Sequence, residues 1–323
     1  MLKEKDLVTL ARKKQKTIVF PEAGFSEKML NAAFAVYDKK IAKLILIGDE
    51  SAMVLRNKRV NRFEIINPKT SELTETLAKA LCKKKKDLKV ESARALLLDP
   101  YYFGTMLVEE GYADGMLGGA EVETDKLLAP AFEVIKAEEK DGLISSCFLV
   151  LSKTGVFKDR EVILSDCALN ENPTSQELVQ IADSAVKTAE ALRMSPKVAF
   201  LSYSTHGSVK GEMAQKVQKA VKLFNNNKAI AFDGEIQFDA AVDENVAKLK
   251  CPNSPLKGQA NVLIFPDRGA GNVCYKAIKY TSGAVTLGPI MQGLKKPVNS
   301  LLRSCTISDI VLMTAITVLQ CKE

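Results

Sequence analysis

The sequence has 323 residues, of which 46% are hydrophobic and 26% are charged, a balance typical of globular proteins and not of disordered chains. At about 100–200 residues per domain, this length predicts two domains, each large enough to bury a core. The formal charge of +7 is mild and spread along the chain, and aromatic residues make up only 6%, without Trp. These values exclude the base-stacking surfaces of nucleic-acid-binding proteins and suit a small polyanionic ligand.

Seven cysteines are scattered along the chain without a C-x-x-C pair, and there is a single histidine, His206. This pattern argues against a disulfide framework and against a zinc site, so we expect free thiols, a reducing compartment and no metal. No apolar stretch reaches about 18 residues, and the N-terminal segment interleaves charged and apolar residues, unlike a secretory signal. The sequence therefore predicts a cytoplasmic protein without membrane spans.

Short apolar runs alternate with helix-period segments along most of the chain. The runs are rich in Val, Ile, Leu and Phe and end near Gly, Pro, Asp or Ser, as expected for strands buried on both faces. They are TIVFPEA from Thr17, IAKLILIGD from Ile41, EIINP from Glu64, ADGMLGGA from Ala113, SSCFLVLS from Ser145, EVILSDCA from Glu161, KVAFLSYS from Lys197, AIAFDGE from Ala229 and NVLIFPD from Asn261. The alternation predicts an α/β fold with mainly parallel sheets and helices on both faces of each sheet, an α/β/α arrangement.

Two further patterns refine this organisation. The runs from Ser145 and Glu161 follow one another too closely for a helix between them, which predicts an antiparallel hairpin. The charged stretch Lys136–Gly142 is the best candidate for a domain boundary. Thr174 and Glu177 have the spacing of a capping box at the start of a helix.

Two loops after predicted strands carry residues suited to phosphate. In DRGAGNVCYK, Gly269, Gly271 and Asn272 precede a helix that we expect to begin near Val273, where free N–H groups attract anions. A simple tight turn explains these glycines equally well, and Cys274 replaces the third glycine of a dinucleotide fingerprint.

In the second loop, SYSTHGSVKGE, hydroxyl groups and glycine gather before another helix. Its candidate binding residues are Ser204, Thr205, Gly207 and Ser208. Phosphate binding and ordinary helix capping explain this cluster equally well. His206 has no evident partner in the sequence and is interpreted as a loop histidine.

Three charged features near predicted helix ends remain open between two interpretations. Asp309 forms a capping-box pattern with Thr306, which favours a structural role over that of a general base. Arg303 is either a surface arginine or a bidentate phosphate ligand. The basic run Lys83–Lys86 predicts a solvated helix end, with a docking patch for phosphates, including Lys86, as the alternative.

At this point several segments, taken in order, resemble the phosphate acetyltransferase family along nearly the whole chain. They are YYFGTMLVEEGYADGM, SDCALNENPT, KVAFLSYSTHGS, DGEIQFDAAV, ANVLIFPDRGAGNVCYK, LGPIMQGL and KPVNSLLRSCTISD. The resemblance implies two α/β domains flanking a cleft, residues 1–141 plus 298–323 and residues 142–297, and a homodimer. It also implies interconversion of acetyl-CoA plus phosphate with acetyl phosphate plus CoA, without a metal or redox cofactor.

The resemblance also assigns roles to individual residues. An aspartate of the family takes the proton of the CoA thiol, and the thiolate attacks the acetyl carbonyl. Asp309 matches this aspartate, Arg303 matches the phosphate-binding arginine, and Asn299 begins the same motif. Asn299, Lys86 and the two loops above are the expected substrate-binding residues.

The sequence departs from the family's usual pattern at positions near this motif. Leu302 stands where the family usually has a serine, and Ala129 where an arginine usually precedes proline. Glu121 and Glu123 add carboxylates to a region expected to bind anions. Two hypotheses follow: an active phosphate acyltransferase with acetyl as the default group, or a weakened paralogue that binds CoA or acyl phosphate. An enzyme adapted to another short acyl group is a variant of the first.

Overall fold

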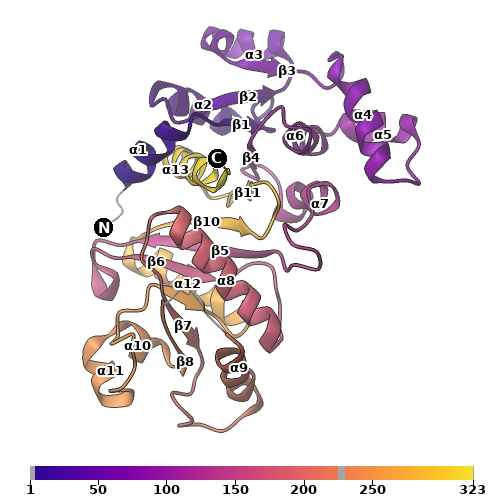
Figure 1. The fold of residues 1–323 in the computed structure, drawn as a ribbon. Coiled ribbons are helices and arrows are strands. Elements are labelled where there is room, and N and C mark those ends of the chain that lie inside the picture. The colour runs from indigo at the N-terminus through magenta and orange to yellow at the C-terminus, as the bar shows by residue number, and fades with distance from the viewer. Residues whose placement is uncertain (1–3, 225–229, 323) are drawn as a thin grey trace. The chain divides into compact units, whose positions relative to one another are not determined.

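The computed structural model describes residues 4–224 and 230–322, which divide into two compact units (Figure 1). The N-terminal unit contains residues 4–140 and 294–322, so the end of the chain folds together with its beginning. The middle unit contains residues 141–224 and 230–293. Each unit is an α/β structure with its own sheet.

The N-terminal unit is built around a parallel sheet with the strand order β11-β4-β1-β2-β3. The strands are β1 (Thr17–Phe20), β2 (Lys43–Ile47), β3 (Glu64–Ile66), β4 (Gly115–Gly118) and β11 (Val298–Ser300). The helices are α1 (Glu4–Lys14), α2 (Glu27–Asp38), α3 (Glu50–Arg56), α4 (Leu73–Lys84), α5 (Val90–Leu97), α6 (Pro100–Glu109), α7 (Thr124–Val134) and α13 (Ile307–Gln320), with the 3₁₀ turn η1 (Lys58–Arg62).

The C-terminal helix α13 forms part of the core of this unit. Every residue from Ile310 to Leu319 is buried, as expected for a helix covered by neighbours on all sides. The buried hydroxyls of Thr314 and Thr317 donate to carbonyls of the preceding turn. It packs against α1 and α2 and against strands β1 and β4, and α1 and α13 lie side by side in Figure 1. Burial of each large aliphatic side chain stabilises the unit by about 1.5–3 kcal/mol.

The middle unit contains a mixed sheet with the strand order β10-β5-β6-β9-β7-β8. The strands are β5 (Ser145–Leu151), β6 (Glu161–Ser165), β7 (Lys197–Leu201), β8 (Ala231–Ile236), β9 (Val262–Ile264) and β10 (Val285–Gln292). The helices are α8 (Ser175–Ala191), α9 (Glu212–Leu223), α10 (Phe238–Val242), α11 (Glu244–Lys250) and α12 (Arg268–Ser282), with the 3₁₀ turn η2 (Gly155–Phe157). Only the pairs β10–β5 and β5–β6 are antiparallel.

Several expectations from the sequence are confirmed. Each of the nine apolar runs coincides with one of the strands β1 to β9, and only β8 extends one residue beyond its run. Ala229, the first residue of that run, lies outside the described residues. The hairpin is the antiparallel pair β5–β6. Capping boxes form at Thr174 of α8 and Thr306 of α13, each with both reciprocal hydrogen bonds. The two mainly parallel sheets confirm the α/β fold class.

Strands β10 and β11 are missing from the expectation. β10 contains Gly288 and Pro289, which normally indicate a turn, and its register with β5 shifts between Leu287 and Ile290. Proline is tolerated there because β10 lies at the edge of the sheet. β11 has only three residues, too few for a period to show. Among the described residues, no helix is long and apolar enough to cross a membrane.

Candidate functional site

The segment between β11 and α13 carries Arg303 and Asp309. Arg303 is exposed, and no carboxylate of the described residues lies within ion-pair distance of its guanidinium. Its backbone carbonyl accepts a hydrogen bond from Lys28 Nζ of α2 at 3.0 Å, which anchors the backbone of the segment. The backbone of Arg303 is therefore anchored, and its exposed guanidinium is available to an anion.

Asp309 lies three residues after the N-cap of α13 and is half-buried. Its Oδ2 accepts the backbone N–H of Thr306 at 2.9 Å, and its own N–H donates to Thr306 Oγ1 at 3.1 Å. Within the described chain, Oδ1 of Asp309 accepts no hydrogen bond. The capping interpretation is thus confirmed, and it leaves one carboxylate oxygen available for another contact.

Asn299, on β11, is completely buried. Its Nδ2 donates to Thr317 Oγ1 at 2.9 Å and to Gln320 Oε1 at 2.6 Å. These bonds tie β11 to the last turn of α13. The side chain of Asn299 is therefore buried inside the unit, whereas that of Arg303 is exposed.

The departures from the family pattern fall at surface positions. Leu302 is half-buried beside Arg303, and Ala129 is exposed on α7. Neither side chain is among the fully buried core residues.

Cys305, in the same segment, is buried. Burial raises the pKa of its thiol and outweighs the opposing effect of Lys28, while the carboxylates of Asp309 and Glu22 raise this pKa by smaller amounts. A thiol of this kind stays protonated at neutral pH and is a poor nucleophile. No group of three or more potential metal-ligating side chains occurs among the described residues.

In the middle unit, the loop after β7 is folded around Glu235, a buried residue that the sequence analysis overlooked. Oε1 of Glu235 accepts the hydroxyl of Ser204 at 2.7 Å and the N–H of Gly207 at 2.7 Å. Thr205 Oγ1 donates to Gln237 Oε1 at 3.3 Å, and Ser208 Oγ accepts the N–H of Thr205 at 3.0 Å. Most polar groups of the cluster thus satisfy one another, and Ser208 is the member whose side chain is exposed.

This arrangement predicts an acid-sensitive contribution to stability. Burial raises the pKa of Glu235, but the hydrogen bonds from Gly207 and Ser204 outweigh it and bring the pKa below the ordinary value of 4.5. A lowered pKa in the folded state stabilises the protein above the unfolded pKa, and this stabilisation is lost as the pH falls through the folded value. Glu235→Gln should therefore lower the melting temperature at pH 7, and the difference from the parent should narrow below pH 4.5.

Thermal melts from pH 7 to pH 3 test this expectation. Glu171→Gln serves as the control. The exposed Glu171 carboxylate forms an ion pair with Arg268 at 3.5 Å, and such surface pairs contribute little to the free energy of unfolding. A constant difference between Glu235→Gln and the parent over the whole range would contradict the assignment.

His206 has a partner after all. Its Nε2 lies 3.0 Å and 3.1 Å from the two carboxylate oxygens of Asp233 on β8, a strand that the sequence does not place beside the loop. His206 lies in the loop after β7, so its interpretation as a loop histidine is confirmed, and the structure adds the partner that the sequence did not show. Sequence distance hid this pair, because parallel pairing of β7 with β8 brings the two residues together.

The loop DRGAGNVCYK, the first of the two candidate phosphate loops, differs from the expectation. α12 begins at Arg268 and not near Val273, with Asp267 as N-cap accepting the N–H of Ala270 at 2.9 Å. Gly271 therefore lies in the first turns of the helix. A Cβ at this position would approach the backbone oxygen of Asp166 to 2.5 Å, so close packing of α12 on the loop after β6 explains the glycine.

The loop after β6 is organised by Asp166, a second buried carboxylate. It accepts the N–H groups of Ala168, Leu169 and Asn170 at 2.9, 3.2 and 3.0 Å, and the hydroxyl of Ser146. Asn272 on α12 donates to the carbonyl of Cys167 in the same loop at 3.3 Å. Asn272 thus fastens the helix start to this loop, and Gly269 is the exposed member of the predicted trio.

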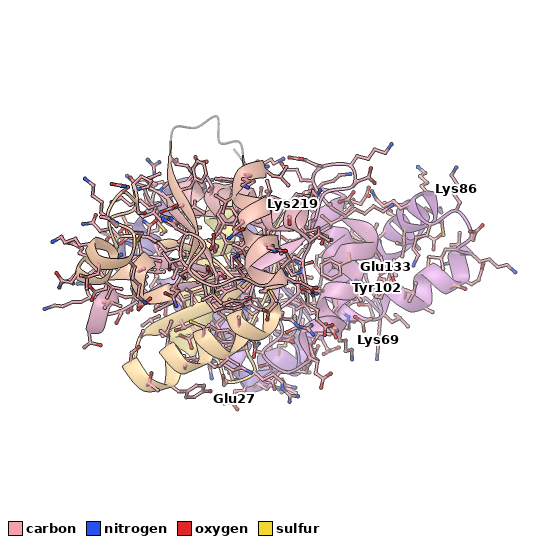
Figure 2. All side chains as sticks on the ribbon, turned by 90° about the horizontal axis from the view of Figure 1, so that it is seen from below. Glu27, Lys69, Lys86, Tyr102, Glu133 and Lys219 are labelled. Atoms are coloured by element: carbon pink, nitrogen blue, oxygen red, sulfur yellow. The ribbon has the colours of Figure 1, made fainter. Side chains whose placement is uncertain are left out.

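Lys86 lies beyond the end of α4, at the end of the basic run Lys83–Lys86, in which Lys84 and Lys85 form ion pairs with carboxylates. Lys84 pairs with Glu109 at 2.5 Å, and Lys85 pairs with Glu133 at 2.6 Å. Tyr102 also donates to Glu133, and Figure 2 shows these two side chains next to each other. Lys86 forms no ion pair with the described residues, so it offers an uncompensated charge.

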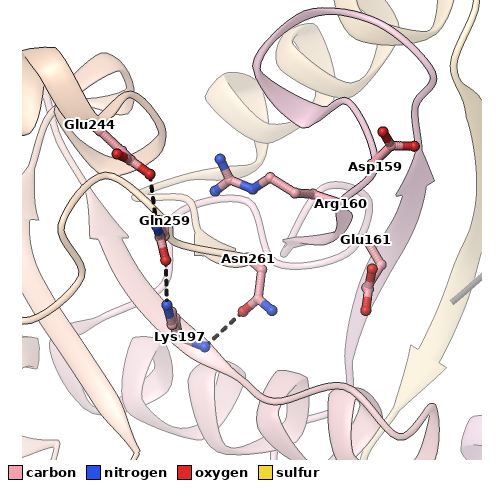
Figure 3. Close-up of a pocket in the computed structure, with 7 residues that line it drawn as sticks. All are labelled: Asp159, Arg160, Glu161, Lys197, Glu244, Gln259 and Asn261. Carbon is pink, nitrogen blue, oxygen red and sulfur yellow. Dashed lines mark hydrogen bonds between the residues drawn. The ribbon is translucent and has the colours of Figure 1, made fainter. Parts of the chain in front are cut away.

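Two pockets lie away from these residues, one in the middle unit and one of about 470 Å³ in the N-terminal unit, lined by Lys43 and Glu64 among others. Figure 3 shows a pocket of about 430 Å³ in the middle unit, at the starts of β6 and β7. Its side chains mostly bind one another: Lys197 Nζ donates to Gln259 Oε1 at 2.8 Å, and Gln259 Nε2 donates to Glu244 Oε1 at 2.7 Å. The pocket lies at the amino ends of the strands. The predicted residues follow the carboxyl ends, where ligands of parallel α/β sheets bind.

Comparisons with known proteins decide which family this site belongs to. The family model for phosphate acetyl/butaryl transferase matches residues 2–318. The chain belongs to this family. It is 41% identical over 324 residues to a phosphate acetyltransferase of Nitratidesulfovibrio vulgaris, covering 98% of this chain and 45% of the relative. It is 40% identical to the phosphate acetyltransferase of Clostridium acetobutylicum, covering 97% and 96% of the two chains.

The fold agrees with a solved member of this family. A phosphotransacetylase from Staphylococcus aureus superposes with a TM-score of 0.89 at 38% identity, covering 99% of each chain. The relative lengths differ, however, because the chain spans less than half of the Nitratidesulfovibrio protein and nearly all of the Clostridium one. The family model's match over residues 2–318 confirms the family resemblance inferred from the sequence.

Proposed function

We propose that this protein is a phosphate acetyltransferase, which interconverts acetyl-CoA plus phosphate with acetyl phosphate plus CoA. The observation that carries the proposal is the family match over residues 2–318, combined with an unpaired Arg303 and an available Asp309 oxygen in one short segment. No metal or redox cofactor takes part in this proposal. The test is an assay of phosphate-dependent CoA release from acetyl-CoA.

In the proposed mechanism, Asp309 is the general base for the thiol of CoA. Oδ2 stays bound to the N–H of Thr306, which fixes the carboxylate, while Oδ1 accepts the thiol proton. The thiolate attacks the carbonyl carbon of acetyl phosphate, and phosphate leaves as the carbonyl re-forms. The reverse reaction runs through the same states, with Asp309 returning the proton to the sulfur.

Arg303 is the proposed phosphate ligand. A guanidinium presents its donors in a planar fork that matches two phosphate oxygens, and it stays charged at every physiological pH. Because the Arg303 backbone is anchored by Lys28, less backbone freedom is lost when phosphate binds. We also propose that two loops contact CoA or the acyl phosphate, through the exposed residues Ser208 and Gly269. Ser204, Thr205 and Gly207 belong to the same loop as Ser208.

Leu302 favours a second candidate function. A leucine cannot donate a hydrogen bond to the oxyanion of the tetrahedral intermediate, and one such donor contributes about 2.7–4 kcal/mol. The alternative is an enzyme for another short acyl group, or a protein that binds CoA or acyl phosphate with slow turnover. Acetyl-, propionyl- and butyryl-CoA in the same assay distinguish these cases. Fast cleavage of acetyl-CoA supports the first proposal, and preference for a longer chain supports the second.

We also propose that the protein forms a homodimer. Exposed apolar side chains on α12, Val273 at 70% and Tyr280 at 74%, offer a surface that a second copy would cover. Sedimentation of the 35.3 kDa chain measures the oligomeric state directly.

We further propose that Lys86 contributes to CoA binding, and this assignment predicts a salt-dependent effect on the affinity for CoA. Lys86→Ala should weaken CoA binding about threefold at low ionic strength, and the effect should vanish near 1 M salt, where the screening length falls to about 3 Å. Calorimetric titration at both salt concentrations measures this change. Lys86→Arg keeps the charge and should bind CoA like the parent. Equal loss in both variants, or a loss that persists at high salt, would contradict the electrostatic role.

A further inference from the structure

Glu22 is a third buried carboxylate beneath a loop, and it lies next to the segment of Arg303. It follows β1, the central strand of the N-terminal unit, and its side chain is 0% exposed. Oε1 accepts the phenol hydroxyl of Tyr101 at 2.8 Å and the N–H of Gly119 at 3.0 Å, and Oε2 accepts the N–H of Ala120 at 2.9 Å. Three donors thus compensate the buried carboxylate, which would otherwise be costly.

The two amides belong to the loop after β4, and this loop supports the start of the Arg303 segment. β4 pairs with β11, and the N–H of Leu301 donates to the carbonyl of Gly118 at 2.8 Å. Gly119 has a φ of +90°, and a Cβ there would lie 2.7 Å from Ser300 Oγ and 3.1 Å from the nitrogen of Leu301. The Gly119 backbone is therefore in close contact with the chain two to three residues before Arg303.

The backbone of Glu22 organises the second support. Its carbonyl accepts the N–H groups of Phe25 and Ser26 at 3.1 and 2.8 Å, which form the turn into α2. Ser26 is the N-cap of this helix, and two residues later Lys28 reaches the carbonyl of Arg303. Both structures that hold the Arg303 backbone therefore meet at Glu22.

We propose that the Glu22 carboxylate is a positioning group for Arg303, acting through the loop after β4, and so sets the affinity for phosphate. The start of α2 depends only on the backbone carbonyl of this residue. This assignment rests on the proposed function for its kinetic consequence. Glu22 does not touch the reacting atoms in this proposal. Its carboxylate occupies the two amides of the Gly119–Ala120 loop and thereby keeps the neighbouring segment in one conformation.

Glu22→Gln tests the assignment with almost no change in size. The amide group replaces one acceptor oxygen by a donor, so at least one of the three bonds is lost and donor faces donor. A misplacement of about 1 Å can cost a hundredfold in rate, so we expect kcat to fall at least tenfold and the KM for phosphate to rise at least about fivefold. The KM for acetyl-CoA should stay within about twofold, since Arg303 binds phosphate and not the thioester.

Tyr101→Phe is the matched control. It removes a hydrogen bond from the same carboxylate but leaves both backbone amides bound, so it destabilises the protein without releasing the loop. We expect a lower melting temperature and both KM values within about twofold of the parent. If Glu22→Gln does not fold, Glu22→Asp, which keeps the charge but is shorter, provides the same comparison with smaller changes.

A second measurement does not depend on activity. Amide hydrogen exchange should quicken in peptides covering residues 116–122 and 298–306 of Glu22→Gln, and not in peptides from the middle unit. A parent without phosphate-dependent cleavage would refute the proposed function, and exchange would still decide whether Glu22 holds this segment. Unchanged exchange at 298–306, or equal rises in both KM values, would overturn the positioning role.

Discussion

Asp309→Asn is expected to lower kcat for phosphate-dependent acetyl-CoA cleavage by about 10²–10⁴-fold, the usual contribution of a general base. The carboxamide oxygen can still accept the N–H of Thr306, so the cap of α13 survives, but the side chain can no longer take up the thiol proton. Stability should fall by only about 0.3–1 kcal/mol, because a charge near the helix N-terminus is lost. Steady-state kinetics and thermal melts of the purified variant measure the two effects.

Thr306→Ala separates the two roles of this residue pair. It removes the hydroxyl that accepts the N–H of Asp309 and should cost about 1 kcal/mol in stability, while the Asp309 carboxylate remains. Activity near the parent level in Thr306→Ala, with loss in Asp309→Asn, supports the base. Full activity in Asp309→Asn would remove the aspartate from the mechanism and leave only its cap.

The second large effect is expected at the positions where this chain departs from its family. Leu302→Ser adds a hydroxyl donor beside Arg303, and Ala129→Arg adds a cation on the exposed side of α7. A donor to the oxyanion is worth about a hundred- to a thousandfold in rate, so the double variant should cleave acetyl-CoA faster than the parent. Because neither residue is in the core, the melting temperature should change little.

The control for this gain is the acyl series. If the parent is specialised for a longer acyl group, Leu302→Ser should raise activity on acetyl-CoA and lower it on the preferred thioester. A parent without activity together with an active double variant would favour the weakened paralogue. A double variant that is slower than the parent on every thioester would contradict a family-like transition state at this site.

Local patterns were sufficient for most elements. The nine apolar runs, the hairpin and both capping boxes depend on residues close together in the chain, so their signals are complete in the sequence. β10 and the start of α12 were missed because their residues are explained only by the tertiary structure. Locally, Pro289 and Gly271 indicate a turn. In the fold, Pro289 is tolerated because β10 lies at the sheet edge, and Gly271 is required by close contact with the loop after β6.

The candidate site shows the same division. Arg303 and Asp309 stand in a motif that sequence alone identifies, and the cap at Asp309 follows from its spacing to Thr306. The sequence could not show that Oδ1 stays available, or that Ser204 and Gly207 are bound to Glu235 from a distant strand. Nor could it show the partner of His206.

The sequence by itself thus determined three features: the family, most of the strand and helix pattern, and the two charged residues of the C-terminal motif. Each of these depends on residue type and local spacing. The tertiary structure alone decided the roles of the three buried carboxylates, Glu22, Asp166 and Glu235. Each accepts backbone N–H groups from a loop after a strand, and two of the three loops are 28 or more residues away along the chain. Parallel strands bring such distant loops to one edge, and burial then requires that each carboxylate find its donors there.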